Sequence, residues 1–240
     1  GAIRGGFIQY TKVPNFRSIY WHVDLPFATS WWRSLGLLAN TFAMESFIDE
    51  MALKANKNAV DFRIQQIGDD AIGVRLKNVI KAASEKANYS EEITNGRAMG
   101  FAASIDAGTP CAQVVEVSIV DNEIIVHKVT VSLDPGLAVN PDQIRAQCEG
   151  CVIMGMSAVL YEQMYVENGE LQPTIYGPYK MALMKNAPKE IDVVLLQGKD
   201  TPGAVGEPPL GPIGAAIANA VRRLTGQRLT ELPLKLPRTI

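Results

Sequence analysis

Hydrophobic and polar positions change their period along the chain, and this change separates helical from extended parts. Apolar residues at helical spacing predict three early helices, which cover Met44–Asn56, Ala59–Gln66 and Val74–Ala87. From residue 96 the pattern becomes an alternation of β-branched residues. It predicts three strands, over Gly96–Ser104, Cys111–Val120 and Ile124–Leu133. Residues 1–40 are rich in aromatic residues and interrupted by proline and glycine, which indicates short strands and loops.

Turn and cap residues set further boundaries. Asp121-Asn122 is typical of a hairpin turn between two of these strands. Asn140 and Pro141 suit the N-cap and the first position of the longest helix. We expect that helix to end before Asn168-Gly169, where the sequence favours a turn.

The last third of the chain returns to helix after one extended segment. That segment is predicted at Ile191–Gln197, and the final helix at Ile213–Leu224. Thr225-Gly226 is a suitable C-cap. Helices and hairpin-joined strands together predict an α+β fold rather than a doubly wound parallel sheet. The sequence has no G-x-G-x-x-G after a strand, so a dinucleotide-binding fold has no support.

Composition narrows the function classes. The chain has 240 residues, 47% of them hydrophobic and 20% charged, which is ordinary for a globular protein. Its formal net charge of −2 and the lack of a basic block argue against nucleic-acid binding. No apolar run approaches the ~20 residues of a membrane helix. Three cysteines cannot make a disulfide framework.

The loop around Glu207 is the strongest candidate for chemistry. It reads Gly203-Ala-Val-Gly-Glu-Pro-Pro-Leu-Gly-Pro, so one carboxylate stands among apolar and conformationally restricted residues. Such surroundings predict a raised pKa, which suits proton abstraction near neutral pH. Gly206 would permit close approach of the backbone to a ligand, and Pro208 favours an extended Glu207. The alternative is a surface loop in which glycine and proline only break secondary structure.

Two other polar residues have both a functional and a structural interpretation. Arg33, after Trp31-Trp32, could hold a phosphate or carboxylate, or it could stack on the indole rings. Gln113, near the start of an apolar strand, could hydrogen-bond a ligand or cap the strand edge.

The sequence Cys148-Glu149-Gly150-Cys151 is a C-x-x-C motif that could act as a redox pair or as half of a zinc site. No second cysteine or histidine pair completes it, which favours buried helix cysteines. Asn219 lies in a helix of small residues and needs a hydrogen-bond partner if it is buried.

The ordered set of segments resembles a known family, the molybdopterin-binding subunit of the molybdenum hydroxylases. This family includes xanthine dehydrogenase and aldehyde oxidase, and the most similar branch is the isoquinoline 1-oxidoreductase β-subunit type with the bacterial aldehyde dehydrogenases. The resemblance covers almost the whole chain from Val13 onward. The segments that carry it are Trp32–Gly36, Asn40–Glu50, Ala112–Val117, Asp134–Pro141, Ala146–Gly150, Gly206–Pro209 and Ala218–Leu234.

The resemblance implies a fold, a cofactor and a reaction. The fold would be the second molybdopterin-binding domain of this type, with the chain as one C-terminal domain over 1–240. Its two mixed α/β subdomains would be 1–95 with 200–240, and 96–199. The cofactor would be molybdenum bound to molybdopterin, with the cytosine dinucleotide form as an option. The reaction would be oxidation of an aldehyde or N-heteroaromatic carbon with oxygen derived from water.

Site residues follow from the same resemblance. Glu207 matches the family's general base, which takes a proton from the metal-bound hydroxide. The resemblance assigns no metal ligand to this chain. It places these residues near the cofactor: Arg33, Ser34, Leu35, Gly36, Ala112, Gln113 and Gly206.

The resemblance also implies partners. Family subunits are much longer than this chain, which is similar to their second half. An N-terminal molybdopterin-binding half, or a separate chain with that role, would complete the cofactor site. A 2Fe–2S small subunit would carry electrons away, and a small molecule would be the substrate. The bacterial cytoplasm and periplasm both stay open, because an export signal would lie upstream. The alternative function is a non-catalytic remnant or interaction module of the same fold that binds no metal alone. A third is a thiol redox protein that uses Cys148 and Cys151.

Overall fold

The computed structural model describes residues 3–7, 9–198 and 201–237. Its elements, in chain order, are α1 (Leu37–Lys54), α2 (Ala59–Gln66), α3 (Ala71–Ala87), β1 (Arg97–Asp106), β2 (Thr109–Val120), β3 (Glu123–Leu133), α4 (Pro141–Leu160), β4 (Tyr165–Glu167), β5 (Glu170–Gln172), η1 (Met184–Asn186), β6 (Glu190–Leu195), η2 (Pro208–Leu210) and α5 (Ile213–Thr225). Helices and a mainly antiparallel sheet confirm the predicted α+β class.

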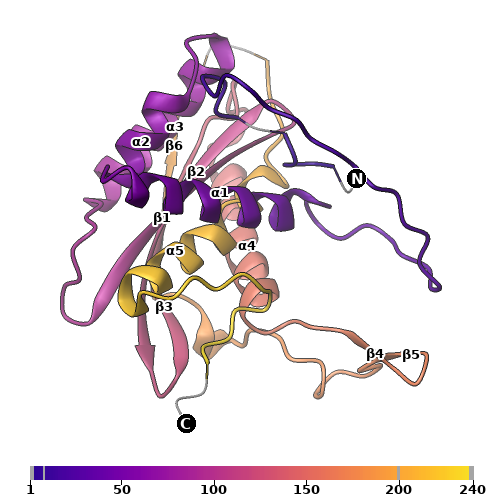
Figure 1. Cartoon of the computed structure of the whole chain (residues 1–240). Coiled ribbons are helices and arrows are strands. Elements are labelled where there is room, and N and C mark those ends of the chain that lie inside the picture. The colour runs from indigo at the N-terminus through magenta and orange to yellow at the C-terminus, as the bar shows by residue number, and fades with distance from the viewer. Residues whose placement is uncertain (1–2, 8, 199–200, 238–240) are drawn as a thin grey trace.

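One four-stranded sheet organises the molecule, in the order β1-β2-β3-β6. The β1–β2 and β2–β3 pairs are antiparallel, and β6 is parallel to β3. A long connection through α4 returns the chain to β6, as a parallel pair requires. The β4–β5 hairpin stands away from the sheet at the end of an extended arm (Figure 1).

Helices cover both faces of the sheet, and each face has its own hydrophobic core (Figure 1). On one face α4 and α5 bury residues such as Val115 and Val131. On the other, α2 and α3 pack on residues such as Phe101 and Val114. This alternation follows from the two-residue period of a strand. The division of the chain into subdomains 1–95 with 200–240, and 96–199, stays a prediction.

The small residues of α5 allow it to lie very close to β1. A Cβ added at Gly100 would lie 1.9 Å from the carbonyl oxygen of Ala216, so only glycine fits there. At Gly214 an added Cβ would lie 3.0 Å from Val159. The glycine and alanine residues therefore fix α5 against β1 and α4, and with it the Glu207 loop that leads into α5.

Several turn and cap residues predicted from the sequence do lie at the ends of helices and strands. Asp121 and Asn122 form the β2–β3 turn with positive φ angles of 50° and 62°. The Asn140 side chain accepts a hydrogen bond from the amide of Gln143, with Pro141 at the first position of α4. Gly226 ends α5 with a left-handed φ of 73°.

Two predicted helix boundaries and the strands predicted near the N-terminus were wrong. Helix α1 begins at Leu37 and not Met44, because the chain becomes helical directly after the Arg33–Gly36 turn. Helix α4 ends at Leu160, well before Asn168-Gly169, which instead forms the tip of the β4–β5 hairpin. The described part of residues 1–36 contains no strand, and its extended backbone has no sheet partner.

Candidate functional site

The Glu207 loop is held from both sides by residues far away in the sequence. Glu207 precedes η2, and its carbonyl oxygen accepts hydrogen bonds from the amide of Leu210 and the hydroxyl of Ser34, both at 2.9 Å. Pro208 and Pro209 are buried behind it. The backbone of Glu207 is thus fixed, while its side chain keeps 38% of its surface exposed.

The Glu207 carboxylate has polar partners, which corrects the prediction of an apolar environment. Oε2 accepts a hydrogen bond of 2.6 Å from Nη1 of Arg4, and Oε1 accepts one of 3.2 Å from the amide of Ser34. Burial alone would raise the pKa of Glu207. The hydrogen bonds from Arg4 and Ser34, with the positive charges of Arg4 and Arg33, outweigh it, and the pKa lies below its ordinary value. The predicted rise in pKa was therefore wrong in sign.

Arg4 is itself anchored by a buried aspartate. Its Nε donates to Oδ1 of Asp106 at 2.8 Å, and its Nη2 pairs with the second carboxylate oxygen of Asp106. Sequence patterns gave no sign of Arg4 or Asp106. They lie 203 and 101 positions from Glu207, so no local spacing could have linked them.

The predicted Arg33–Gly36 segment does lie against this loop. Nε of Arg33 donates to the carbonyl oxygen of Gly206 at 2.6 Å, and Nη2 donates to Oε1 of Gln147 at 2.6 Å. These contacts, rather than stacking on Trp31 or Trp32, occupy the guanidinium. The cation–π contacts found in the described residues involve other arginines.

The turn after Arg33 has unusual backbone conformations. Ser34 and Leu35 have φ angles of 72° and 54°, a region that residues with a side chain seldom adopt. Gly36 then forms the N-cap of α1. The conformation points the amide of Ser34 at the Glu207 carboxylate, so the turn supplies one of its two donors.

Gln113 contacts the same loop, but Ala112 does not lie with it. Gln113 is fully buried in the central strand β2, and its Nε2 donates to the carbonyl oxygen of Pro209. Its Oε1 is buried without a hydrogen-bond partner in the described structure. Ala112 belongs to the core on the opposite face, as the alternation of β2 requires.

The surroundings of the two C-x-x-C cysteines indicate a structural role. Cys148 and Cys151 are buried on α4 with free thiols, and burial raises the pKa of each to about 12. The Cys151 thiol donates to the carbonyl oxygen of Gly206 at 3.3 Å, so it supports the loop. Thiols with such pKa values are poor nucleophiles, which disfavours the redox interpretation.

The described residues show neither a metal-ligating cluster nor a membrane-spanning helix. They contain no group of three or more His, Cys, Asp or Glu side chains that could hold a metal ion. None of their helices combines the length and apolar character needed to cross a bilayer.

Similarity to known proteins places the chain in a family. The family model of the molybdopterin cofactor-binding domain matches residues 41–188. The isoquinoline 1-oxidoreductase beta subunit of Brevundimonas diminuta is 33% identical over 85% of this chain and 26% of its own length. A nicotinate dehydrogenase subunit of Pseudomonas putida is 31% identical over 87% of this chain and 19% of its own. The chain thus spans about a quarter or less of these relatives.

The fold agrees with this result. The structure of quinoline 2-oxidoreductase from Pseudomonas putida 86 superimposes with a TM-score of 0.72 over 84% of this chain and 51% of that chain, at 11% identity. From these matches, the chain belongs to the molybdenum hydroxylase family and carries its molybdopterin cofactor-binding domain.

Proposed function

We propose that this chain forms one wall of a molybdenum–molybdopterin site and supplies its general base, Glu207, in the oxidation of an aldehyde or an N-heteroaromatic carbon. The observation that carries the proposal is the position of Glu207. Its backbone is fixed by Ser34 and η2, whereas its carboxylate is partly exposed. A rigidly held and accessible carboxylate is suited to proton transfer.

The residues around the loop suit an anionic pterin cofactor. Oε1 of Gln113 is a buried acceptor to which no group of the described residues donates, and a pterin ring carries N–H groups. The Arg33 guanidinium supplies positive charge beside Gly206. Among the described residues, a Cβ at Gly206 would meet only Oε1 of Gln147, at 4.0 Å, so the backbone there is open to close approach. In this proposal Arg33, Ser34, Leu35, Gly36, Gln113 and Gly206 contact the cofactor, and Ala112 supports β2 from the other face.

When bound, the cofactor supplies a two-electron acceptor and activates oxygen derived from water. Glu207 accepts the proton that this activation releases. The carboxylate is ionised at neutral pH, which is the form able to take up a proton, and its lowered pKa makes it a weaker base than an unpaired glutamate. Arg4 and Ser34 orient the two carboxylate oxygens.

The proposal requires partners. The cofactor, whether simple or in its cytosine dinucleotide form, would be shared with an N-terminal half or companion chain, and a 2Fe–2S subunit would receive electrons. Two projecting segments support a companion. They are the N-terminal stretch and the arm with β4 and β5, which leave the helical body on the same side of the molecule (Figure 1). Both expose large apolar side chains, including Trp21, Trp31, Tyr176 and Met184.

The Glu207→Gln variant tests the base. In the enzyme assembled with its other half and cofactor, we expect turnover to fall by about 10²- to 10⁴-fold, with molybdenum content unchanged. Glu123→Gln, at the exposed β2–β3 turn, is the matched control and should keep full turnover. Turnover retained in Glu207→Gln would refute the role.

The interaction-module alternative rests on the same apolar segments. It predicts that protein purified from its natural context with its partner contains neither molybdenum nor pterin. Stoichiometric metal and pterin in that material would exclude this alternative.

A further inference from the structure

The projecting N-terminal stretch contains a segment with the side-chain pattern of a β-strand, residues 19–25. An apolar residue stands at every second position of this segment, and the residues between them carry polar groups. This is the pattern of a strand with one buried face. The apolar side chains are nevertheless 52–78% exposed, and they are Ile19, Trp21, Val23 and Leu25. The face that the pattern prepares for burial is therefore uncovered.

Contacts within segment 19–25 show that its backbone is extended. The Tyr20 hydroxyl lies 3.1 Å from Nδ1 of His22, and Nε2 of His22 lies 3.2 Å from Oδ1 of Asp24. Side chains two positions apart meet in this way when they stand on the same face of an extended chain. The backbone has no turn or bend from residue 15 to residue 25. The segment thus has a polar row on one face and an apolar row on the other.

The backbone of segment 19–25 has no partner among the described residues. None of its amides or carbonyl oxygens joins their sheets or their loop hydrogen bonds. Pro26 follows the segment and cannot donate to a strand ladder, so a strand would end there. An extended segment with free backbone groups and an apolar row is suited to addition to a sheet edge. In that arrangement the main chain supplies affinity and the side chains fill pockets of the partner.

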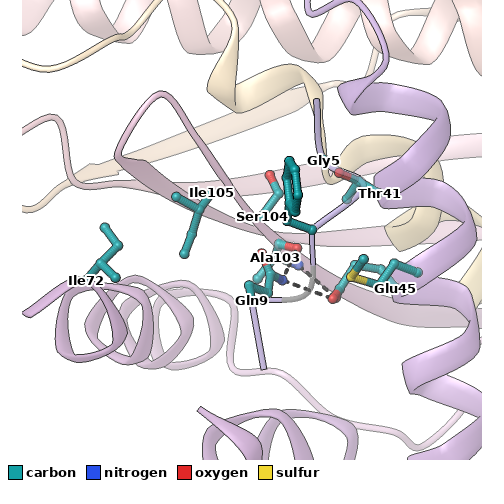
Figure 2. Close-up of a pocket in the computed structure, with 10 residues that line it drawn as sticks. Gly5, Gln9, Thr41, Glu45, Ile72, Ala103, Ser104 and Ile105 are labelled. Carbon is teal, nitrogen blue, oxygen red and sulfur yellow. Dashed lines mark hydrogen bonds between the residues drawn. The ribbon is translucent and has the colours of Figure 1, made fainter. Parts of the chain in front are cut away.

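The sheet of this chain is a poor host for the same segment of a second copy, because side chains already occupy its β1 edge. The amide of Ala103 donates to Oε2 of Glu45 at 3.0 Å, and its carbonyl oxygen accepts from Gln9 at 2.8 Å (Figure 2). The carbonyl oxygen of Phe101 accepts from Nδ2 of Asn219 at 2.9 Å. These groups are not free to pair with another strand.

The opposite edge strand, β6, is protected in another way. It has only six residues, and Nη1 of Arg145 donates to the carbonyl oxygen of Val193 in its middle at 2.6 Å. Short edge strands and occupied backbone groups are common means of blocking edge pairing. The described sheet of a second copy therefore offers segment 19–25 no long free edge.

We propose that segment 19–25 adds as a strand to an open sheet edge of the companion half, with its apolar row in a groove of that partner and its polar row toward solvent. The identity of the partner rests on the proposed function. Arg33 follows the segment by eight positions and donates to the carbonyl oxygen of Gly206, so a partner on this strand would lie beside the proposed site. The arm with β4 and β5 leaves the body on the same side and would contact the same partner (Figure 1).

Hydrogen–deuterium exchange at single-amide resolution tests the strand. In the isolated chain, the amides of segment 19–25 should exchange as fast as those of an unfolded peptide, at every protein concentration. In the enzyme assembled with its other half and cofactor, every second amide should slow by about 10²-fold or more, because alternate N–H groups of an edge strand point at its partner.

Three results of this experiment would overturn the proposal. The first is equal exchange in the isolated chain and the assembled enzyme. The second is uniform slowing of all amides in the segment, which would show burial without pairing at an edge. The third is slowing in the isolated chain that grows with its concentration, which would identify a second copy as the host.

Two aromatic residues on opposite faces of the segment give a matched pair of variants. Trp21→Ser shortens the apolar row, and Tyr20→Ser shortens the polar row. Both residues are exposed, at 78% and 57%, so neither variant should lower the stability of the isolated chain. In the assembled enzyme, Trp21→Ser should reduce the slowing by about 30-fold, as expected for an aromatic anchor, and Tyr20→Ser by less than about 3-fold. Equal reductions would contradict docking through the apolar row.

The Glu207→Gln variant separates this proposal from the proposed base. It should keep the full slowing in segment 19–25, because Glu207 has no contact with the segment among the described residues. Slowing together with retained turnover in Glu207→Gln would support the strand and refute the base. Absence of slowing in the native enzyme, together with lost turnover in Glu207→Gln, would refute the strand and support the base.

Discussion

Glu45 and Glu207 are both paired with an arginine, but the two regions differ in burial and in unused bonding capacity. Glu45 is 1% exposed, and its two carboxylate oxygens accept four hydrogen bonds in the interior. The Glu207 side chain is 38% exposed and accepts two, one for each oxygen. Since a carboxylate offers about four acceptor sites, only Glu207 keeps bonding capacity for a ligand.

The difference teaches that pairing with arginine does not by itself mark a functional carboxylate. Arg63 is 0% exposed and also donates to the carbonyl oxygens of Ala59 and Glu45, both at 3.0 Å. It ties α2 to α1. Arg4 instead joins the N-terminal segment to β1 and reaches Glu207 with its Nη1 group. The Glu45 region holds helices together, whereas the Glu207 region orients a group at the surface.

The largest expected effect is on the free energy of unfolding, which should fall much more when Glu45 is replaced than when Glu207 is replaced. Glu45→Gln removes the hydrogen-bonded carboxylate partner of a fully buried guanidinium and leaves it only Asp49, at 3.9 Å, so we expect unfolding in urea to show a loss of about 3–5 kcal/mol. Glu207→Gln affects a pair that solvent screens, and we expect a change of less than about 1 kcal/mol. Similar losses in the two variants would contradict the contrast.

A smaller loss of stability is expected when Glu45 loses only one of its hydrogen-bond donors. Tyr10 is fully buried, and its hydroxyl donates to Glu45. Tyr10→Phe removes this donor and keeps the ring, so we expect a loss of about 1.5–3 kcal/mol by urea unfolding, typical of a hydrogen bond to a charged group. Tyr20→Phe is the matched control, because Tyr20 is 57% exposed, and it should change stability little. An unchanged Tyr10→Phe variant would mean that this hydroxyl does not support Glu45.

The sequence predicted the elements whose signals are local. Asn140 caps α4 through an amide three residues away, and Asp121-Asn122 forms a tight turn, so a short window contains all the information. Helix α1 was harder. Its apolar pattern included Phe47, which is 65% exposed, while the charged Glu45 is buried. Buried ion pairs with α2 reverse the usual rule, and hydrophobic periodicity cannot show them.

The candidate site was predictable only in part. The Glu207 loop and Arg33 were recognised from their residue types and from the resemblance, and they do lie together. Arg4 and Asp106 were missed, and with them the sign of the pKa shift of Glu207. That shift depends on a contact across 203 positions, which only the tertiary structure supplies.

The smallest expected effect concerns the lowered pKa of Glu207. Arg4→Gln removes the ion pair and the hydrogen bond to Glu207, so the pKa of Glu207 should rise. A depressed folded-state pKa contributes stability above the unfolded value of about 4.3, and this stability is lost as pH falls through the folded pKa. In Arg4→Gln the contribution of the Glu207 pair should shrink by less than about 1 kcal/mol because solvent screens it, whereas loss of the partner of buried Asp106 is a separate and larger cost in stability. Carboxyl NMR titration of Glu207 measures the pKa directly.

Arg17→Gln is the control for this titration, because Arg17 is an exposed arginine of the same N-terminal segment, and no contact joins it to Glu207 in the described structure. It should leave the pKa of Glu207 unchanged. If both variants leave it unchanged, then Arg4 does not hold the carboxylate in solution, and Ser34 would be the remaining donor to it. If only Arg4→Gln raises it, the N-terminal segment sets the protonation of the proposed base. In that case a single contact far from the loop in sequence would tune the region of the molecule where chemistry is proposed, and the Glu45 region would keep a purely structural role.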